Sequence, residues 1–444
     1  MVRPHRTGRG VSNPTLPASG AGPVSSAGLA LSVLGPRQQK SWAVTQNSTN
    51  RKALGLAFFI VFLDLLGASI LLPVIPYIVR AYRPDALTVG WLSLSFSAAQ
   101  FLATPVLGAL SDRVGRRPVL LISILGSAFG YFLFGWAGSL WVLFLSRIID
   151  GLTGGNISTA QAYIADMSRP EDRAKNFGLI GAAFGLGFLL GPAIGGALSK
   201  ISLQAPAFGA GIVSLATLFT AMVFLPESLP KEARRKVAFR VRDLDPLHKI
   251  VGPLRRPMLR WLLPGFFMLS LAMSGLQSNF AVYTLNRYGL TPPQNGWILV
   301  WLGAVSVVMQ GYVVRKVLPK VGETRLASEA LVISVAGYAL LAWSPQAWWL
   351  YPAIGVIAMG NGLAGPALWA LLSREGDPQE QGVLMGVGSS LSSLARVGGP
   401  ILAGAAFDRA GMSSPYWMGA AFMVVGFFLI RAAAADQPRA QAQT

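Results

Sequence analysis

Residues 108–119 read Gly-Ala-Leu-Ser-Asp-Arg-Val-Gly-Arg-Arg-Pro-Val and lie between two long apolar stretches. The string predicts a tight, charged loop of a few residues that joins two lipid-soluble helices. Its arginines place the loop on the cytoplasmic side of a membrane. Its glycines allow two helix ends to approach closely, and its aspartate offers a partner to an arginine or a helix terminus. The residues concerned are Gly108, Asp112, Arg113, Gly115, Arg116 and Arg117.

The composition places the chain in a membrane. The 444 residues are 53% hydrophobic and 12% charged, with a mean hydropathy of +0.52, whereas a soluble domain is about 25% charged. There is no cysteine, and His5 and His248 both lie outside the apolar segments. Disulfides, thiol catalysis and cysteine metal sites are therefore excluded, and almost nothing remains for a zinc site or a Ser-His-Asp triad. We expect no metal, no cofactor and no enzymatic activity.

Apolar windows long enough to span a bilayer recur along the chain. Their predicted bounds are 53–79, 87–110, 118–137, 139–165, 176–199, 206–226, 259–284, 292–314, 326–344, 347–372, 382–407 and 413–432. The prediction is an all-α integral membrane protein with twelve transmembrane helices in two six-helix pseudo-repeats. These are an N-terminal bundle over 53–226 and a C-terminal bundle over 259–432. A cytoplasmic linker over 227–258 joins them, and residues 433–444 form a C-terminal tail.

The loop charges predict the orientation. With the N-terminus inside, most loop Lys and Arg fall on the cytoplasmic side, and this asymmetry places both termini in the cytoplasm. The external loops hold only Arg80, Arg83, Lys200, Arg287 and Arg409. The net charge of +19 therefore lies in short loops at regular intervals, which argues against nucleic-acid binding.

Residues 1–52 differ from the rest of the chain. They are rich in Ser, Gly and Pro and contain no acidic residue, the first being Asp64. One interpretation is a disordered basic tail, or an over-extended start, on a multi-pass protein of the cell (inner) membrane. The other is an organelle transit peptide, which has this composition and would place the chain in an organelle membrane.

The two predicted bundles resemble each other. Residues 191–196 (Gly-Pro-Ala-Ile-Gly-Gly) pair with residues 399–404 (Gly-Pro-Ile-Leu-Ala-Gly), and Gly90-Trp91 echoes Gly296-Trp297. Two parallel repeats predict a substrate path between the halves. The second copy of the charged loop keeps its basic residues, but Leu318 stands where Asp112 maps.

Ionisable residues deep within the predicted spans mark functional positions, because a charge there costs a few kcal/mol. Asp64 lies roughly 16 Å into the first span, near the bilayer midplane. Asp150 lies at a similar depth in the fourth span, with Arg147 one turn away on the same face. That pair is either a structural ion pair or a titrating Asp150 tuned by Arg147. Asp64 is the better proton carrier, because no cationic residue lies within one turn of it in the sequence.

Polar residues in the spans are candidates for the substrate cavity. Span 7 carries Ser274 and Gln277 on one helix face, and span 4 carries Asn156. Each such residue also has a plain interpretation as a helix–helix contact. No acidic residue lies within one turn of Arg396 in span 11, so it either faces the cavity, where an acidic substrate or Asp64 would meet it, or binds backbone carbonyls.

Small residues follow one face of span 5. Gly187, Gly191 and Gly195 recur every four residues, with Pro192 and Gly196 among them. Close helix packing is the plain explanation of such a stripe.

Taken together, these strings resemble the major facilitator superfamily. Asp64 to Pro76, Arg147 to Gly155, Ala162 to Asp166 and Arg169 to Ala174 are most similar to its drug:proton antiporter group, in the tetracycline-resistance branch. The resemblance covers roughly residues 53–432. It implies that the span 5 glycine motif favours exchange over leak. It also implies a cytoplasmic latch in the outward-open state, with Asp112 bracing the start of helix 11 near Gly382 and Arg116 meeting Asp166.

The sequence also departs from that branch. Gly130 and Ser334 stand where tetracycline exporters carry aspartates in helices 3 and 9, and span 8 has no histidine. Asp150 stands where those exporters carry a small residue. The transporter class survives these differences, but tetracycline itself does not follow as the substrate.

The sequence therefore predicts a monomeric, proton-coupled antiporter that exports an amphipathic small molecule by alternating access. Its partners are the substrate, the proton and the lipid bilayer. One alternative is a proton symporter that imports a sugar or an organic anion. Another is a receptor or scaffold that kept a transporter fold.

Overall fold

The computed structural model of the chain describes residues 54–154, 156–168, 173–231, 256–375 and 381–441, together with Arg234 and Leu254. The chain divides into two compact units, Met1–Lys52 and Ala53–Thr444, and the description concerns the second. The predicted tail over 1–52 and most of the predicted linker over 227–258 lie outside the described residues.

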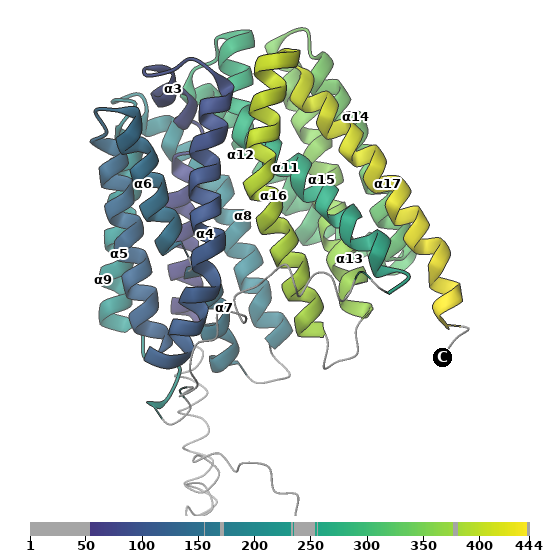
Figure 1. Cartoon of the computed structure of the whole chain (residues 1–444), viewed down its shortest axis with the longest axis horizontal. Helices are drawn as coiled ribbons and strands as arrows, with labels where there is room; N and C mark the ends of the chain where they lie inside the picture. The colour runs from purple at the N-terminus through teal and green to yellow at the C-terminus, as the bar shows by residue number, and fades with distance from the viewer. Residues whose placement is uncertain are drawn as a thin grey trace, which may run out of the picture. The chain divides into compact units, whose positions relative to one another are not determined.

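Every secondary-structure element of the described part is a helix (Figure 1). The N-terminal half holds a helix over 54–70, α3 (Ile75–Arg80), α4 (Ala86–Val114), α5 (Arg116–Gly135), α6 (Leu140–Thr153), α7 (Asn156–Met167), α8 (Arg173–Leu198) and α9 (Ala205–Phe224). The C-terminal half holds α11 (Leu259–Tyr288), α12 (Pro292–Val308), the π-helix η5 (Met309–Val313), α13 (Val314–Val321), α14 (Glu323–Trp343), the 3₁₀ turn η6 (Ala347–Trp349), α15 (Leu350–Arg374), α16 (Gln381–Ala410) and α17 (Ser414–Gln441).

The predicted all-α membrane fold is confirmed, and each of the twelve predicted windows falls on helix. Within the described residues, nine helices are long and apolar enough to cross a membrane, the first of them over Leu54–Arg80. The three remaining windows coincide with α6 and α7 together, with α8 and with α16. The first span is itself bent, because Pro73 and Pro76 interrupt it at a turn over 71–74.

The sequence predicted that the charged string at 108–119 forms a loop of several residues. This prediction is wrong, because all of the string except Gly115 is helical. Asp112 and Arg113 lie in the last turn of α4, and Arg116 and Arg117 lie in the first turn of α5. Only Gly115 separates the two helices, with a φ of 118°. Glycine adopts this conformation readily, so the chain reverses within one residue and all four charged side chains are held on helix.

We name the two ends of the bundle by their residues. The Asp85 end holds the connections at 81–85, 199–204, 289–291 and 411–413, and the Asp112 end holds those at Gly115, 225–231 and Gly322. In Figure 1 the labels of α3 and α7 lie toward the Asp85 end and the Asp112 end, respectively.

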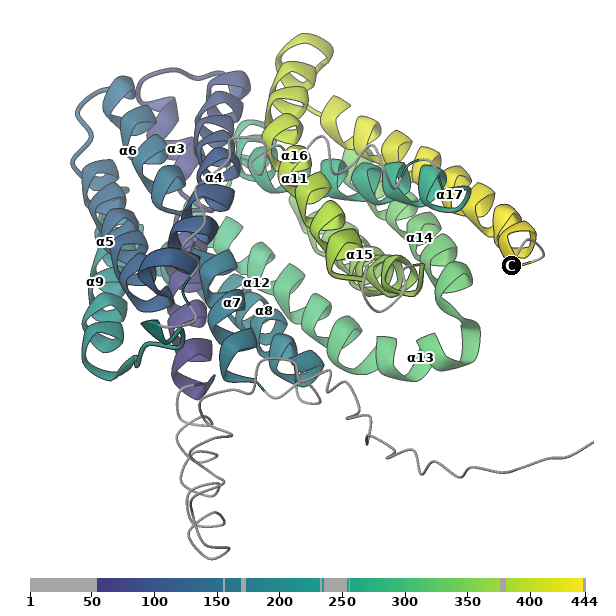
Figure 2. The same ribbon diagram turned by 60° about the horizontal axis from the view of Figure 1, so that its bottom comes forward.

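The two halves meet through a pair of equivalent backbone contacts. A Cβ atom placed on Gly90 of α4 would stand 2.6 Å from the carbonyl oxygen of Pro400 in α16. A Cβ atom on Gly296 of α12 would stand 2.5 Å from the carbonyl oxygen of Pro192 in α8. Both helix pairs lie side by side in Figures 1 and 2. The sequence repeat thus places the same Gly-to-Pro contact on both sides of the interface.

Other contacts between α8 and α12 continue away from the Asp85 end, where Gly303 meets Leu189 and Gly185 meets Val307. The contacts of Gly404 and Gly196 lie toward the Asp85 end. Gly404 packs against Ala86 and Leu87, with a virtual Cβ 2.9 Å from the Ala86 oxygen, and Gly196 packs against Pro293 at 3.0 Å. Such distances leave no room for any side chain, so the Asp85 end is closed in this conformation.

We expect Gly90→Ala and Gly296→Ala to open the Asp85 end. The added methyl would overlap a backbone oxygen, and overpacking costs about 1–3 kcal/mol, enough for roughly a tenfold shift toward the open form. Because the chain has no native cysteine, a single Val282→Cys, at a position 5% exposed in this end, reports opening by its rate of reaction with an impermeant maleimide. Gly365→Ala, with no atom within 4 Å, is the matched control. Equal labelling rates in all variants would contradict the prediction.

Candidate substrate path and proton-coupling site

A buried ion pair lies within the N-terminal half. Arg147 Nη1 lies 3.2 Å from Asp150 Oδ2, and the two side chains are 8% and 4% exposed. Both residues belong to α6, three positions apart, so they share one face as the sequence predicted. Ser127 of α5 forms a side-chain hydrogen bond with Asp150. The carboxylate is therefore held by two polar partners inside the helix bundle.

Three aromatic rings enclose the guanidinium of Arg147. Its central carbon lies 5.9, 5.5 and 4.8 Å from the ring centroids of Phe96, Tyr131 and Phe134. In the described part of the chain its Nε and Nη2 atoms are buried without a hydrogen-bond partner. The ring faces supply the electrostatic attraction that these donors lack. Arg147 is thus fixed among α4, α5 and α6 and does not face the other half.

Glycines bring α6 close enough for this arrangement. A Cβ atom on Gly130 would stand 3.0 Å from the Cβ of Asp150, and one on Gly151 would stand 2.8 Å from the Cβ of Ala99. Gly130 is the position at which the sequence departs from the aspartate of the resembling exporters. In this chain the buried carboxylate next to position 130 is that of Asp150 on α6. The two differences from the resembling exporters, at positions 130 and 150, therefore concern the same place in the fold.

Tyr131 lies between the first span and the buried pair, a contact that was not predicted from the sequence. Asp64 is partly buried in the helix over 54–70, and the Tyr131 ring lies 3.6 Å from the Cβ position of Gly67, one turn after Asp64. On its other contact, the ring centroid lies 5.5 Å from the guanidinium carbon of Arg147. The available signal was the single tyrosine of α5, next to Gly130.

The glycine stripe of α8 faces the span that carries Asp64. Virtual Cβ atoms on Gly187 and Gly195 come within 3.0 Å of the Leu65 Cβ and 2.9 Å of the Ile70 carbonyl carbon, and one on Gly191 would overlap Ser69. Ser69 Oγ also donates a hydrogen bond of 2.8 Å to the Gly187 carbonyl. The predicted close packing is present, and its partner is the first span.

The predicted cavity residues separate into different places. Gln277 and Arg396 are exposed, and the side chain of Asn156 lies outside the described residues. Ser274 is 7% exposed, and it packs between α11 and α16, where its Oγ lies 2.8 Å from the Cβ position of Gly399. The contact with α16 covers Ser274 in this conformation, and its place in the substrate cavity stays a prediction.

The charged residues of the Asp112 end form a network. Arg116 pairs with Asp112 at 2.5 Å and with Asp166 at 3.1 Å, the second pairing being the one the resemblance implied. Arg117 Nη2 donates to the Met222 carbonyl at the end of α9, at 2.6 Å. The ends of α4, α5, α7 and α9 are thus bound together.

Glu227 completes this network and was missed, because the sequence analysis assigned it to the linker. Its carboxylate accepts hydrogen bonds from the backbone N–H groups of Arg116, Ser228 and Leu229 at 2.8, 3.1 and 3.1 Å. It caps the N-terminus of α5, for which the preceding Gly115 supplies no side chain. A Cβ on Gly115 would stand 2.9 Å from the Glu227 Cδ atom, which explains the glycine.

Of the remaining parts of the predicted latch, one is not formed among the described residues and one stays untested. No atom lies within 4 Å of the Cβ position of Gly108, so the close approach expected there is absent from this conformation. Residues 376–380 lie outside the described residues, and the contact of Asp112 near Gly382 stays a prediction.

Polar contacts between the halves close the Asp85 end. The backbone N–H groups of Ala86 and Leu87, the first two of α4, donate to the carboxylate of Asp408 in α16 at 3.1 and 2.8 Å. Asp85 caps the same terminus from within the N-terminal half, accepting from Thr88 N at 2.6 Å. The first turn of α4 is therefore capped by one carboxylate from each half.

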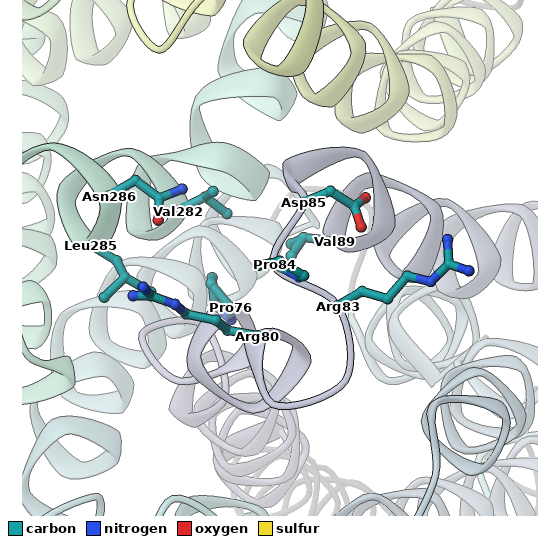
Figure 3. Close-up of a pocket in the computed structure, with 9 residues that line it drawn as sticks. All are labelled: Pro76, Arg80, Arg83, Pro84, Asp85, Val89, Val282, Leu285 and Asn286. Atoms are coloured by element: carbon teal, nitrogen blue, oxygen red, sulfur yellow. The ribbon is translucent and has the colours of Figure 1, made fainter.

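A second polar contact joins the first span to the other half. The Tyr77 hydroxyl donates to the Leu290 carbonyl and accepts from Asn295 Nδ2 at 2.6 Å. Between this contact and that of Asp408 lies a small pocket, shown in Figure 3. Its wall is formed by Pro76, Arg80, Arg83, Pro84, Asp85 and Val89 of the N-terminal half and by Val282, Leu285 and Asn286 of α11.

Comparisons with known proteins agree with this architecture. The sequence profile of the Major Facilitator Superfamily matches residues 57–400. The class C tetracycline resistance protein of Escherichia coli is 33% identical over 367 residues, which cover 82% of this chain and 91% of that protein. The human major facilitator superfamily domain-containing protein 10 is 28% identical over 433 residues, covering 87% and 94%.

Solved structures show the same fold. The crystal structure of the human organic anion transporter MFSD10 (TETRAN) has a TM-score of 0.67 at 28% identity and covers 86% of this chain and 99% of that one. The nucleoside transporter NupG has a TM-score of 0.69 at 14% identity, covering 87% and 99%. The second comparison concerns the fold alone.

We expect Asp408→Ala to lengthen the distance between the halves at the Asp85 end, because it removes the cap that spans them. Spin labels at Lys200→Cys and Arg409→Cys report this distance by pulsed electron paramagnetic resonance. Asp85→Ala is the control, since it removes the cap that lies within one half. If Asp408→Ala gave the same distance distribution as the parent and as Asp85→Ala, Asp408 would not hold the end closed.

Glu227→Ala should destabilise the fold, because it leaves three backbone donors without their acceptor. A lost buried acceptor costs about 1–3 kcal/mol, which thermal unfolding in detergent measures. Glu329→Ala removes an exposed i,i+4 pair with Arg325 and should change stability by less than about 0.5 kcal/mol. Equal melting temperatures for the two variants would contradict the role of Glu227.

Proposed function

Because the chain belongs to the Major Facilitator Superfamily, in the branch of the tetracycline resistance proteins, we propose that it is a proton-coupled antiporter that exports an amphipathic small molecule. One observation carries the proposal: two membrane-spanning helices hold carboxylates, and Tyr131 contacts both places, meeting the turn of the first span after Asp64 and the guanidinium that pairs with Asp150. Carboxylates at this depth are costly unless they serve a proton or an ion.

Asp64 and Asp150 have different roles in proton coupling. Asp150 is closed in with Arg147, whose ring cage holds the pair among three helices. Asp64 is less buried and exchanges protons with the path between the halves. Proton binding neutralises Asp64, and Tyr131 transmits the change in charge to the Arg147–Asp150 pair. Asp150 shares the proton load through this link.

Helix α8 couples the proton to the interface between the halves. Its face with Gly187, Gly191 and Gly195 packs on the first span, which carries Asp64, while Pro192 and Gly196 pack on α12 of the other half. A shift of the first span on protonation therefore moves a helix that is also half of an interhalf contact. This arrangement favours alternating access with the halves rocking about a central path.

The proposed orientation places the Asp85 end outside and the Asp112 end in the cytoplasm, since basic loop residues gather at the latter. The described conformation is then closed to the outside. Substrate enters from the cytoplasm, and the open space at Gly108 closes in the opposite conformation, where Asp112, Arg113 and the Arg116–Asp166 pair form the latch. Both walls of the path come from one chain, so a monomer in the cell membrane suffices.

The first test is proton movement. Purified protein in proteoliposomes with an internal pH-sensitive dye is exposed to a panel of amphipathic compounds under an imposed pH gradient. The parent should show compound-dependent proton flux, and Asp64→Asn should abolish it, because the amide cannot bind a proton. Asp150→Asn should reduce it, and Glu329→Gln, an exposed residue of α14, should leave it unchanged. Full flux in Asp64→Asn would refute the assignment of the carrier.

The direction of transport needs a separate measurement. Inverted membrane vesicles energised to be acidic inside should accumulate the compound whose proton flux depends on Asp64, as expected for export from the cytoplasm. A symporter would expel the same compound from these vesicles, and a receptor or scaffold would move neither the compound nor protons.

A further inference from the structure

Arg396 is placed where it does not serve packing. It lies 15 residues after Gln381 in the 30-residue helix α16, which is roughly 22 Å along a helix rising 1.5 Å per residue. A guanidinium at this depth costs a few kcal/mol in lipid and therefore faces a polar space or a partner. Arg396 keeps accessible side-chain surface, whereas Arg147 is almost fully covered.

The helix register shows which space Arg396 faces. It precedes Pro400 by four residues, so the two lie on the same face of α16. On that face the Pro400 carbonyl lies against Gly90 of α4, and Gly404 and Asp408 contact the start of α4. Arg396 is thus directed toward α4 of the other half, one turn beyond the Gly90–Pro400 contact. This position faces the path between the halves that the proposed function requires.

The guanidinium has few protein partners there. Its Nη2 atom donates to Ser393 Oγ at 2.8 Å, and among the described residues it forms no ion pair and no carboxylate acts on it. Arginine offers five donors in a planar fork that matches a carboxylate or sulfonate. The contrast is with Arg147, whose charge is met by Asp150 and three rings.

The neighbouring helix adds a neutral polar group. Gln277 of α11 is exposed, and α11 and α16 pack against each other. An exposed amide on the helix that packs against α16 adds a hydrogen-bonding group for an acidic head group with further oxygens.

We propose that Arg396 binds the acidic group, a carboxylate or sulfonate, of an anionic amphipathic substrate. This inference rests on the proposed transport function and names its substrate class. The substrate anion supplies the charge that the chain omits at this position. Arg396 then selects acids over neutral and cationic molecules of the same shape.

The charge of the substrate has a consequence for energetics. If one proton enters for each monoanion that leaves, two positive charges move inward per cycle. Each charge shifts the attainable concentration ratio about 50-fold per 100 mV of membrane potential. A negative interior therefore drives export of an acid even without a pH gradient.

The test compares three probes that share one ring: 2-naphthalenesulfonate, 2-naphthalenemethanol and (2-naphthylmethyl)trimethylammonium. Their binding to the purified full-length protein in nanodiscs is measured by calorimetry. The parent should bind the sulfonate most tightly, and Arg396→Gln should weaken the sulfonate alone by about tenfold or more, the loss of a charge-assisted hydrogen bond. Arg396→Lys, which keeps the charge, should retain part of the preference. Arg409→Gln, on the same helix but in its last turn, should change nothing.

Three results would overturn the proposal. These are sulfonate binding no tighter than that of the neutral or cationic probe, equal weakening of all three probes in Arg396→Gln, and unchanged sulfonate binding in that variant. If the glutamine variant misfolds, Arg396→Lys still tests the proposal, because it keeps the positive charge. The proton-flux assay is independent, because absence of flux with sulfonate preference intact would refute antiport and leave the anion site standing.

Discussion

The structure depends on two backbone contacts that admit no side chain. Gly90 meets the Pro400 carbonyl, and Gly296 meets the Pro192 carbonyl, at distances that leave no space for a Cβ atom. Because lipid provides no hydrophobic force between helices, close approach of small residues is what holds the halves together. The two contacts lie in the part of the interface nearer the Asp85 end, so the same pair of glycines holds that end closed.

The two intramembrane arginines show how charge is divided between structure and function. Arg147 has a carboxylate, a ring cage and nearly full burial, and it stabilises the N-terminal half around Tyr131. Arg396 has one serine hydroxyl and an exposed position. An intramembrane charge that is paired within the protein stabilises the fold, whereas a charge without an ion-pair partner at the same depth requires a ligand. On this reasoning the N-terminal half carries the proton and the C-terminal half carries the selectivity for substrate.

The sequence predicted the features that depend on local periodicity. The spans, the Arg147–Asp150 face and the α8 stripe follow from helix geometry, and the Arg116–Asp166 pair followed from the family resemblance. Contacts between segments far apart were not predictable in the same way. Tyr131 and Glu227 matter because of what packs on them from other helices, and a hydrophobic window carries no such information. The contact of Ser274 with Gly399 was not predictable for the same reason, since it depends on α16.

The central claim is that the proton on Asp64 controls the contact between the halves. Spin labels at positions 200 and 409 report the opening of the Asp85 end, and their distance distribution is measured as a function of pH in the parent and in Asp64→Asn. The account predicts a pH-dependent shift between a short and a long distance in the parent. It predicts one pH-independent distribution in Asp64→Asn, equal to that of the parent at low pH. The same pH dependence in both proteins would contradict it.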